Sequence, residues 1–351
     1  MKILILPGDG IGPEIMPATL HVLDRANQMF KLDVQWQREE IGLRALRESG
    51  STLPPHVMEL AASAPGVILG PMSRADYPER ARGGINISAE FRVKLDLYAN
   101  IRPARSRPGL SHGGKPMDLV IYRECTEGFY ADRNMHMGLG EFMPTDDTAL
   151  AIRRVTAKCS NRIARRAFEG AMARRKKVAA VHKVGVLPMT DGLFLREVDK
   201  VAADFPEVQL EKVNADAMAA LLVREPARFD VIVTGNMFGD ILSDEASELS
   251  GSLGLAGSVM AGDQQCIAQA QHGSAPDIAG QDRANPTSLI VSAAMLYEWL
   301  APIHGARYAQ AAKAISAAVD AVLADTATRT RDLGGTLGTQ AFAQAVASRL
   351  A

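Results

Sequence analysis

The segment Leu6–Glu14, LPGDGIGPE, follows the apolar run KILI and carries glycine at positions 8, 10 and 12. It is either the phosphate-binding turn of a dinucleotide-binding enzyme or a tight connection between a strand and a helix. A dinucleotide turn has the pattern G-x-G-x-x-G, whose third glycine lets the helix pack closely on the strand. That position is Pro13, which suits the first turn of a helix. The motif therefore favours a sharp strand-to-helix loop, with Glu14 near the positive end of the helix dipole.

Around this segment, short β-rich runs alternate with longer helical patterns. Strands are expected over 2–6, 67–69, 117–124, 178–184, 208–215 and 230–235, and helices over 13–30, 149–175, 191–205 and 216–226. This alternation is typical of an α/β protein with a largely parallel sheet. The chain has 351 residues. Because single cores stop growing near about 250–300 residues, two domains are expected.

The composition excludes several classes of protein. A formal net charge of −1 gives no overall field that would attract nucleic acid or a membrane surface. Cys125, Cys159 and Cys266 lie far apart, which argues against a zinc site and a disulfide framework and favours a reducing compartment. The first apolar run is too short for a signal peptide, and no run approaches the ~20 residues of a membrane span. A cytoplasmic protein is expected.

A group of arginines suggests an anionic substrate. Arg92 and Arg102 flank the apolar segment LDLY, and the segment YRECTEGFY adds Arg123 and Tyr130. A planar guanidinium pairs bidentately with a carboxylate, so the combination indicates a substrate with more than one carboxylate. Taken singly, each arginine is better explained by a surface ion pair, so the prediction rests on the combination.

A pair of aspartates suggests a divalent cation. In GNMFGDILSDEASEL, Asp240 and Asp244 are four residues apart, so both carboxylates project from one face of a helix. A cation would relieve their repulsion, and hard oxygen ligands select Mg²⁺ or Mn²⁺. Asp216 is a possible third ligand. The alternative is a solvated helix start with acidic residues near its positive end. Lys183, just after an apolar run, is either a surface residue or a functional one.

The segment 272–288, HGSAPDIAGQDRANPTS, is polar and rich in small residues. Small residues let a backbone approach a ligand closely, and the Asp277 carboxylate could accept hydrogen bonds from a ribose hydroxyl. The alternative is a surface loop without a ligand.

Taken together, these motifs resemble the β-decarboxylating dehydrogenases, the family of isocitrate, 3-isopropylmalate, homoisocitrate, tartrate and D-malate dehydrogenases. They occur in the family's order over nearly the whole chain: GDGIGPE, FRVKLDLYANIRP, REC-TEG-FY, HK, GNMFGDILSDEAS and HGSAPDIAG with ANP. The resemblance implies an α/β fold with a large twisted mixed sheet, helices on both faces and two subdomains, distinct from the usual Rossmann fold. The glycine-rich loop would then border the active-site cleft, and the 272–288 segment would hold the cofactor.

The resemblance also implies a domain organisation. Residues 1–99 and 252–351 would form a larger cofactor-binding domain. Residues 100–251 would form a smaller domain with the metal site, the dimer interface and an interlocking arm near 130–150. Two subunits would complete each site, so a homodimer is expected.

The same resemblance assigns roles in chemistry. Arg92, Arg102 and Arg123 would bind the carboxylates of a malate moiety. Mg²⁺ or Mn²⁺ would be bound by Asp240 and Asp244 together with Asp216 of the partner subunit. The ion would stabilise negative charge on the developing carbonyl and enolate oxygen. Lys183 of the partner subunit would act in taking the hydroxyl proton, and Tyr130 would protonate the enol left after loss of CO₂.

For the cofactor, the resemblance favours NAD, because NADP-using relatives tend to carry Lys-Tyr where this chain has Asp277 and Ile278. A carboxylate there would repel a 2′-phosphate. The adenosine end of the cofactor would be bound by His272, Gly273, Ser274, Ala275, Asp277 and Asn285, with the His272 ring stacked near the adenine.

The substituent on C3 of the substrate remains open. Isopropylmalate enzymes usually have two leucines where this chain has Ser88 and Ala89. Isocitrate enzymes usually have Ser and Asn at the positions of Asn86 and Ser88, which here carry these residue types in reverse order. The TEG segment at 126–128 also leans toward isocitrate or homoisocitrate, so a polar substituent is favoured.

Other functions fit these motifs less well. Tartrate or D-malate dehydrogenase is the alternative within the family. A non-catalytic regulatory subunit would be expected to lack ligands that this chain retains. A relative acting on phosphorylated hydroxy-amino acids with histidine-bound zinc would need clustered histidines, whereas the seven here are scattered.

Overall fold

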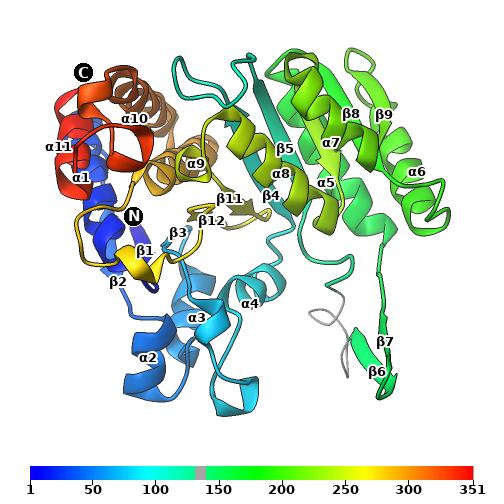
Figure 1. The fold of residues 1–351 in the computed structure, drawn as a ribbon, viewed down its shortest axis with the longest axis horizontal. Helices are drawn as coiled ribbons and strands as arrows, with labels where there is room; N and C mark the ends of the chain where they lie inside the picture. Colours follow the sequence, from blue (N-terminus) through cyan, green and yellow to red (C-terminus); the bar gives the residue numbers. More distant parts are fainter. Residues whose placement is uncertain (131–139, 351) are drawn as a thin grey trace.

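The structure is a computed structural model that describes residues 1–130 and 140–350. A ten-stranded sheet runs through these residues in the order β2-β1-β3-β12-β11-β4-β5-β10-β8-β9 (Figure 1). Its strands are β1 Lys2–Leu6, β2 Gln35–Arg38, β3 Gly66–Leu69, β4 Ala99–Arg105, β5 Asp118–Glu124, β8 Lys177–His182, β9 Gln209–Asn214, β10 Val231–Thr234, β11 Val259–Ala261 and β12 Cys266–Gln269. A separate two-stranded sheet contains β6 Glu141–Thr145 and β7 Thr148–Ala151.

The large sheet is mixed. Strands β2, β1, β3 and β12 are parallel to one another, and so are β5, β10, β8 and β9. Between these two blocks, β11 pairs antiparallel with both β12 and β4, and β4 pairs antiparallel with β5. The expected parallel pairing therefore holds within each block, and the mixed sheet expected from the resemblance is confirmed.

Helices cover both faces of the sheet. They are α1 Gly12–Phe30, α2 Gly42–Ser49, α3 Pro55–Ser63, α4 Ile87–Lys94, α5 Ala157–Met172, α6 Thr190–Ala202, α7 Ala215–Arg224, α8 Asn236–Ser250, α9 Thr287–His304, α10 Ala306–Ala324 and α11 Thr339–Ser348. Successive residues of a strand point to opposite faces. Accordingly, Ile3 and Ile5 of β1 lie in a core with α1, α9, α10 and α11, whereas Leu4 and Leu6 pack with α3 and α4.

The second parallel block follows the same rule. Val231 and Val233 of β10 pack against α5 and α6, whereas Ile232 packs against α7 and α8. Helix α8 therefore lies against one face of the sheet beside β4 and β5 (Figure 1). This contact brings the acidic face of α8 to the two strands that carry Arg102 and Arg123.

The glycine-rich segment forms a tight strand-to-helix loop. Helix α1 begins at Gly12, with Pro13 in its first turn. Gly8 and Gly10 have positive φ, and a Cβ on Gly10 would lie 2.0 Å from the carbonyl oxygen of Ser274. The loop thus packs against the 272–288 segment, which explains why only glycine fits there. The carboxylate of Glu14 accepts hydrogen bonds from the backbone N–H groups of Arg283 and Ala284, at 3.1 and 3.0 Å.

One expected element is wrong. Residues 149–175 do not form a single helix, because Thr148–Ala151 is strand β7 and α5 begins only at Ala157. The side chain of Thr156 caps α5 by accepting a hydrogen bond from the Cys159 N–H, which satisfies an otherwise unpaired donor. The apolar residues 149–152 had made the helical pattern look longer than it is.

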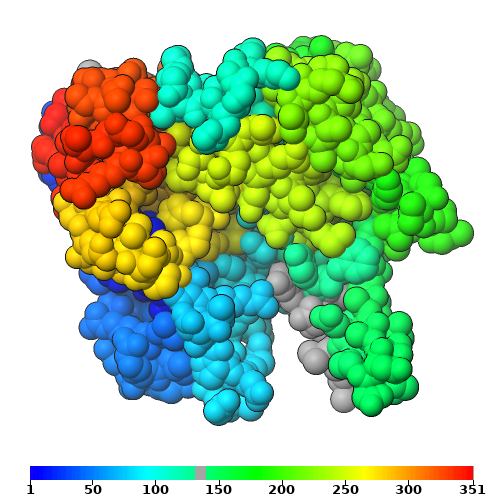
Figure 2. Space-filling model, viewed as in Figure 1, coloured from blue at the N-terminus to red at the C-terminus, as the bar shows by residue number. Residues whose placement is uncertain are grey.

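Strands β6 and β7 form a hairpin that projects from the body of the protein (Figures 1 and 2). All of its strand residues are exposed. They include apolar side chains, Phe142, Met143 and Leu150, and Ile152 follows them directly. The arm expected near 130–150 coincides in part with this hairpin. Residues 131–139 of the expected arm lie outside the described part of the chain.

Among the helices of residues 1–130 and 140–350, none combines the length and apolar character needed to cross a lipid bilayer.

Candidate active site

The site is built around the face of α8 that packs on β4 and β5. Arg123 is almost completely buried, at 2% exposed, and donates from Nε and Nη2 to Oδ1 of Asn236, at 3.0 and 2.6 Å. Its Nη1 donates to Oδ1 of Asp240. From the neighbouring strand, Nη1 of Arg102 donates to the hydroxyl of Ser243 at 2.7 Å and to Asp244 at 3.1 Å. Two of the three predicted arginines therefore meet both aspartates of α8.

Burial lowers the pKa of both guanidinium groups. Loss of hydration lowers the pKa of Arg123 to about 9, and the nearby positive charges of Arg92 and Arg102 act in the same direction. Loss of hydration also lowers the pKa of Arg102, which Asp240 and Asp244 partly offset. Such a concentration of cationic groups favours an anionic ligand.

The two aspartates keep one oxygen each for a further ligand. Asp240 and Asp244 receive their hydrogen bonds from protein side chains at Oδ1: Asp240 from the arginines, and Asp244 from Arg102 and Gln271. Within the described residues, Oδ2 of neither aspartate accepts a hydrogen bond. Their side chains are 39% and 52% exposed. Two accessible carboxylate oxygens on one helix face fit a hard divalent cation.

A cavity borders this cluster of arginines and aspartates. Its empty volume is about 500 Å³, and its lining includes Asn86, Ser88, Arg92, Arg123, Tyr130 and Asp240. We call it the Tyr130 cavity. Six residues singled out in the sequence thus share one space, although they come from α4 and the residue before it, from β5 and the segment after it, and from α8. Arg92 also donates from Nε to the sulfur of Met260, at 3.1 Å.

A second cavity adjoins the first. It has an empty volume of about 690 Å³ and shares Asn86, Ser88 and Arg92 with the Tyr130 cavity. It extends to Arg102 and to His272 and Gly273, so we call it the His272 cavity. The two cavities form one cleft that joins the arginines to the 272–288 segment.

Among the other predicted residues of the 272–288 segment, the side chains of Ser274 and Asn285 are held by hydrogen bonds within the protein. The Ser274 hydroxyl accepts a hydrogen bond from that of Ser73 at 2.8 Å, and Ala275 has a left-handed backbone with φ +38°. Asn285 is buried and donates to Asp332 at 3.0 Å, whereas Asp277 is exposed. Burial lowers the pKa of His272, whose Nε2 is enclosed without a hydrogen-bond partner in the described residues. An uncharged ring at the cleft is suited to contact with a flat ligand.

Lys183 and Asp216 lie apart from the cleft. Lys183 follows β8, Asp216 is in the first turn of α7, and the two form an ion pair of 2.7 Å. The hydrogen bond from Lys183 holds the pKa of Asp216 below its ordinary value. Neither residue lines the Tyr130 or His272 cavity. In the described part of one chain, no cluster of three acidic, histidine or cysteine side chains is arranged to bind a metal.

The structure adds residues that the sequence did not single out. Gln271 donates from Nε2 to Asp244 at 2.8 Å and so ties the 272–288 segment to α8. Arg74 lines both cavities. Its segment, MSRADYPERARGG, carries three arginines, and nothing in their spacing distinguishes the one that faces the cleft.

Asp9 of the glycine-rich loop is the anchor for the segment that carries Arg74. Its buried carboxylate accepts hydrogen bonds from the N–H groups of Leu43 and Ser73, at 2.7 and 3.1 Å, and from the hydroxyl of Tyr77 at 2.5 Å. Burial, followed by the hydrogen bond to Asp9, raises the pKa of Tyr77. The GDG motif therefore organises the wall of the cleft.

Replacing Tyr77 by phenylalanine is expected to lower the free energy of unfolding by about 1.5–3 kcal/mol, because a hydrogen bond to a buried carboxylate is lost. Urea titration followed by circular dichroism measures this change. Tyr308→Phe is the matched control, because the Tyr308 hydroxyl makes no hydrogen bond in the described residues. Equal stability losses in both variants would contradict the anchoring role of Asp9.

The family model described as isocitrate/isopropylmalate dehydrogenase matches residues 2–346. The chain belongs to this family. It is 42% identical over 352 aligned positions to isocitrate/homoisocitrate dehydrogenase of Thermus thermophilus, covering 99% of this chain and 98% of the relative. It is 36% identical to 3-isopropylmalate dehydrogenase of Sulfurisphaera tokodaii, covering 99% and 98%.

A solved structure agrees with these comparisons. The crystal structure of isocitrate dehydrogenase from Methylococcus capsulatus matches with a TM-score of 0.88 and 37% identity, covering 99% of each chain. As a member of the isocitrate/isopropylmalate dehydrogenase family, the protein is an oxidoreductase that acts on a CH–OH group. Family membership supports oxidative decarboxylation of a hydroxy acid.

Proposed function

We propose that this enzyme converts a 3-substituted malate into a 2-oxo acid, CO₂ and NADH, using NAD and Mg²⁺ or Mn²⁺. The observation that carries the proposal is the Tyr130 cavity, in which Arg92, Arg123, Tyr130 and Asp240 share one space. Guanidinium groups there bind carboxylates, and the neighbouring carboxylates bind a cation that holds the hydroxyl oxygen. The names of two relatives, isocitrate/homoisocitrate and 3-isopropylmalate dehydrogenase, support this substrate class.

Asp240 and Asp244 would hold the cation through their Oδ2 atoms, with Asp216 of the partner subunit as a third ligand. When bound, the ion supplies Lewis-acid stabilisation of negative charge on the substrate oxygen. The protein orients these carboxylates with Arg102 and Gln271, which contact Oδ1 of Asp244. Because their positions are set by these contacts, little reorganisation is needed during the reaction.

Proton transfers would be carried by two side chains. Lys183 of the partner subunit takes part in removing the hydroxyl proton when the alcohol is oxidised. Tyr130 is placed in the same cavity as Arg123 and Asp240, from which its phenol can protonate the carbon skeleton after CO₂ leaves. The buried arginines hold the substrate carboxylates during both steps.

The proposed homodimer rests on two features of the surface. Lys183 and Asp216 have side chains 33% and 69% exposed, which leaves them accessible to a second subunit. The β6–β7 hairpin projects from the body of the protein (Figure 2). It exposes several apolar side chains away from the core, as an interlocking arm would require. The smaller domain, residues 100–251, would carry both features.

The larger domain, residues 1–99 and 252–351, would bind NAD along the His272 cavity. In this domain, the hydrophobic core on each face of the sheet combines residues from both of these ranges. The exposed Asp277 carboxylate follows His272 and Gly273, where it can accept hydrogen bonds from an adenosine ribose. A negative charge at this position disfavours a 2′-phosphate, which supports NAD over NADP.

A steady-state assay tests the proposed function directly. The purified enzyme is supplied with Mn²⁺ and either NAD or NADP, and with isocitrate, homoisocitrate, 3-isopropylmalate, tartrate or D-malate in turn. We expect reduction of NAD with release of CO₂, and complete loss of turnover with excess EDTA that Mn²⁺ restores. Absence of turnover with every substrate, as expected of a regulatory subunit, or full turnover in EDTA, would refute the proposal.

A further inference from the structure

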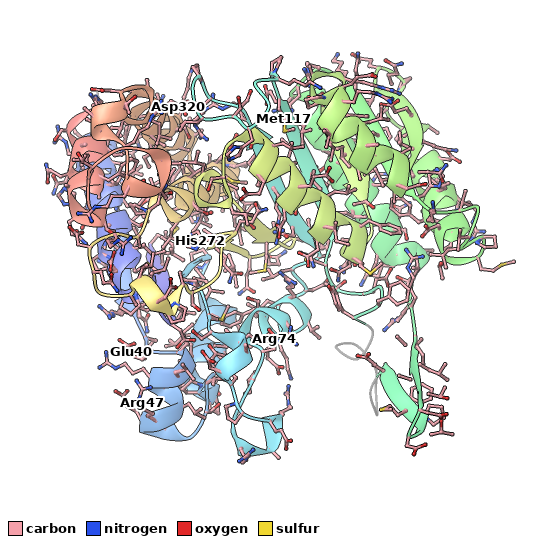
Figure 3. The ribbon with its side chains drawn as sticks, in the orientation of Figure 1. Glu40, Arg47, Arg74, Met117, His272 and Asp320 are labelled. Carbon is pink, nitrogen blue, oxygen red and sulfur yellow. The ribbon has the colours of Figure 1, made fainter. Side chains whose placement is uncertain are left out.

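Arg74 is an additional cationic group in the cleft. It is exposed on a 3₁₀ turn, Arg74–Asp76 (Figure 3). It lines both the Tyr130 and the His272 cavity. Its guanidinium makes no hydrogen bond or ion pair within residues 1–130 and 140–350. Arg102 and Arg123 differ in this respect, because both already contact Asp240. Arg92 donates a hydrogen bond to the sulfur of Met260.

The charge in the cleft exceeds what a dicarboxylate needs. The described lining of the two cavities includes four arginines, Arg74, Arg92, Arg102 and Arg123, and one carboxylate, Asp240. Asp244, together with Asp216 of the partner subunit, would offset the charge of a bound divalent cation, so this excess of positive charge would remain. Further negative charge on the ligand would therefore be stabilised by Coulomb attraction.

The wall beside Arg74 is suited to an oxyanion. Helix α4 starts at Ile87, and the residues around its first turn, Asn86, Ile87 and Ser88, line the His272 cavity. The positive end of this helix dipole thus faces the cleft. Independently, Nε of the buried Arg102 lacks a hydrogen-bond partner among the described residues, on the wall of the same cavity. A buried donor of this kind is usually satisfied by an ordered water or by a ligand, and its position on the cavity wall makes it available to either.

The segment around Arg74 is held in place by hydrogen bonds to the glycine-rich loop and to the 272–288 segment. Ser73 donates its N–H to Asp9 and its hydroxyl to Ser274, and Tyr77 donates its hydroxyl to Asp9. These contacts lie on both sides of Arg74 in the chain. They fix the backbone that carries the arginine while its side chain stays free to pair with a ligand.

We propose that Arg74, together with the first turn of α4, binds a carboxylate on the C3 substituent, so that the substrate is a hydroxy-tricarboxylate of the isocitrate or homoisocitrate type. This inference rests on the proposed function and assigns its substrate class. The remaining arginines of the cleft bind the two carboxylates of the malate moiety. Arg74 is then a determinant of specificity.

Arg74→Gln tests the assignment by removing the charge while keeping a polar side chain. The substrates are isocitrate and homoisocitrate, which carry the third carboxylate, and D-malate and 3-isopropylmalate, which do not. We expect KM for the favoured tricarboxylate to rise roughly 10–100-fold, because a charge-assisted bidentate contact is lost. The kcat/KM for D-malate and 3-isopropylmalate and the KM for NAD should stay within about threefold.

Arg82→Gln is the matched control. It removes the same charge from the same segment, at an exposed residue that lines neither cavity. We expect its kinetic constants to match those of the wild type with every substrate. Arg74→Lys should recover part of the lost affinity, because it restores the charge without the bidentate geometry.

Three results would overturn the inference. The first is wild-type preference for 3-isopropylmalate or D-malate over both tricarboxylates. The second is an unchanged tricarboxylate KM in Arg74→Gln. The third is a rise confined to the KM for NAD, which would place Arg74 on the cofactor. Each of these still leaves an active decarboxylating dehydrogenase, whereas failure of the proposed function would leave the wild type inactive with every substrate.

Discussion

Replacing Asp244 by asparagine is expected to lower turnover by roughly 10³-fold, which corresponds to about 4 kcal/mol of transition-state stabilisation. The physical reason is the loss of a charged oxygen ligand for the cation. Arg102 and Gln271 contact only Oδ1 of Asp244, so Oδ2 is the atom available for this bond. The variant keeps the size of the side chain, and steady-state kinetics with saturating Mn²⁺ measure the loss.

Binding of Mn²⁺ separates a ligand role from a structural one. Titration followed by electron paramagnetic resonance should show at least about tenfold weaker binding in Asp244→Asn. Glu248→Gln, one turn further along α8, removes the same charge and keeps an oxygen that can accept from the Leu253 N–H. This control should bind Mn²⁺ and turn over normally. Near-normal rates and affinity in Asp244→Asn would eliminate it as a ligand.

Mixing two inactive variants is expected to restore activity. Each site is proposed to take Asp244 from one subunit and Lys183 from the other. A heterodimer of a Lys183→Ala chain with an Asp244→Asn chain therefore contains one site with both native residues and one site with neither. Isolated by two different affinity tags, this heterodimer should have about half the activity of the native dimer, whereas either homodimer is nearly inactive.

A second heterodimer provides the matched control. Lys183 and Asp216 pair within one chain at 2.7 Å, so both would serve the partner's site. Combining Lys183→Ala with Asp216→Asn then leaves a defect in each site, and no recovery is expected. If the first heterodimer stayed as inactive as its parents, or the second recovered equally, the shared-site arrangement would be wrong.

Local signals in the sequence predicted much of the fold. The apolar run before Gly8 forms β1, and the proline after Gly12 lies in the first turn of α1. Four-residue spacing correctly placed Asp240 and Asp244 on one helix. These features depend on neighbours within a few positions of the chain, where steric limits and side-chain periodicity act directly. The ordered motifs also predicted the family, which the comparisons confirm.

The local sequence pattern failed to predict features that depend on contacts between residues distant in the chain. Residues 149–175 had a helical pattern throughout, yet residues 148–151 pair with β6. The grouping of Arg102 and Arg123 with Asp240 depends on the antiparallel pairing of β4 with β5 and on the packing of α8 over them. The motifs implied this grouping only through resemblance. The sequence alone offered no physical reason for it.

The sequence by itself predicted many of the strands and helices, their alternation along the chain and the chemical types of side chain available for the site. Only the tertiary structure decided that Arg74 faces the cleft, that Asp9 anchors its segment, and that Gln271 reaches Asp244. The contacts behind these results join residues far apart in the chain, such as Ser73 and Ser274, which are 201 positions apart. Such contacts arise from the strand order of the whole sheet and from packing on its faces, which no short stretch of sequence encodes.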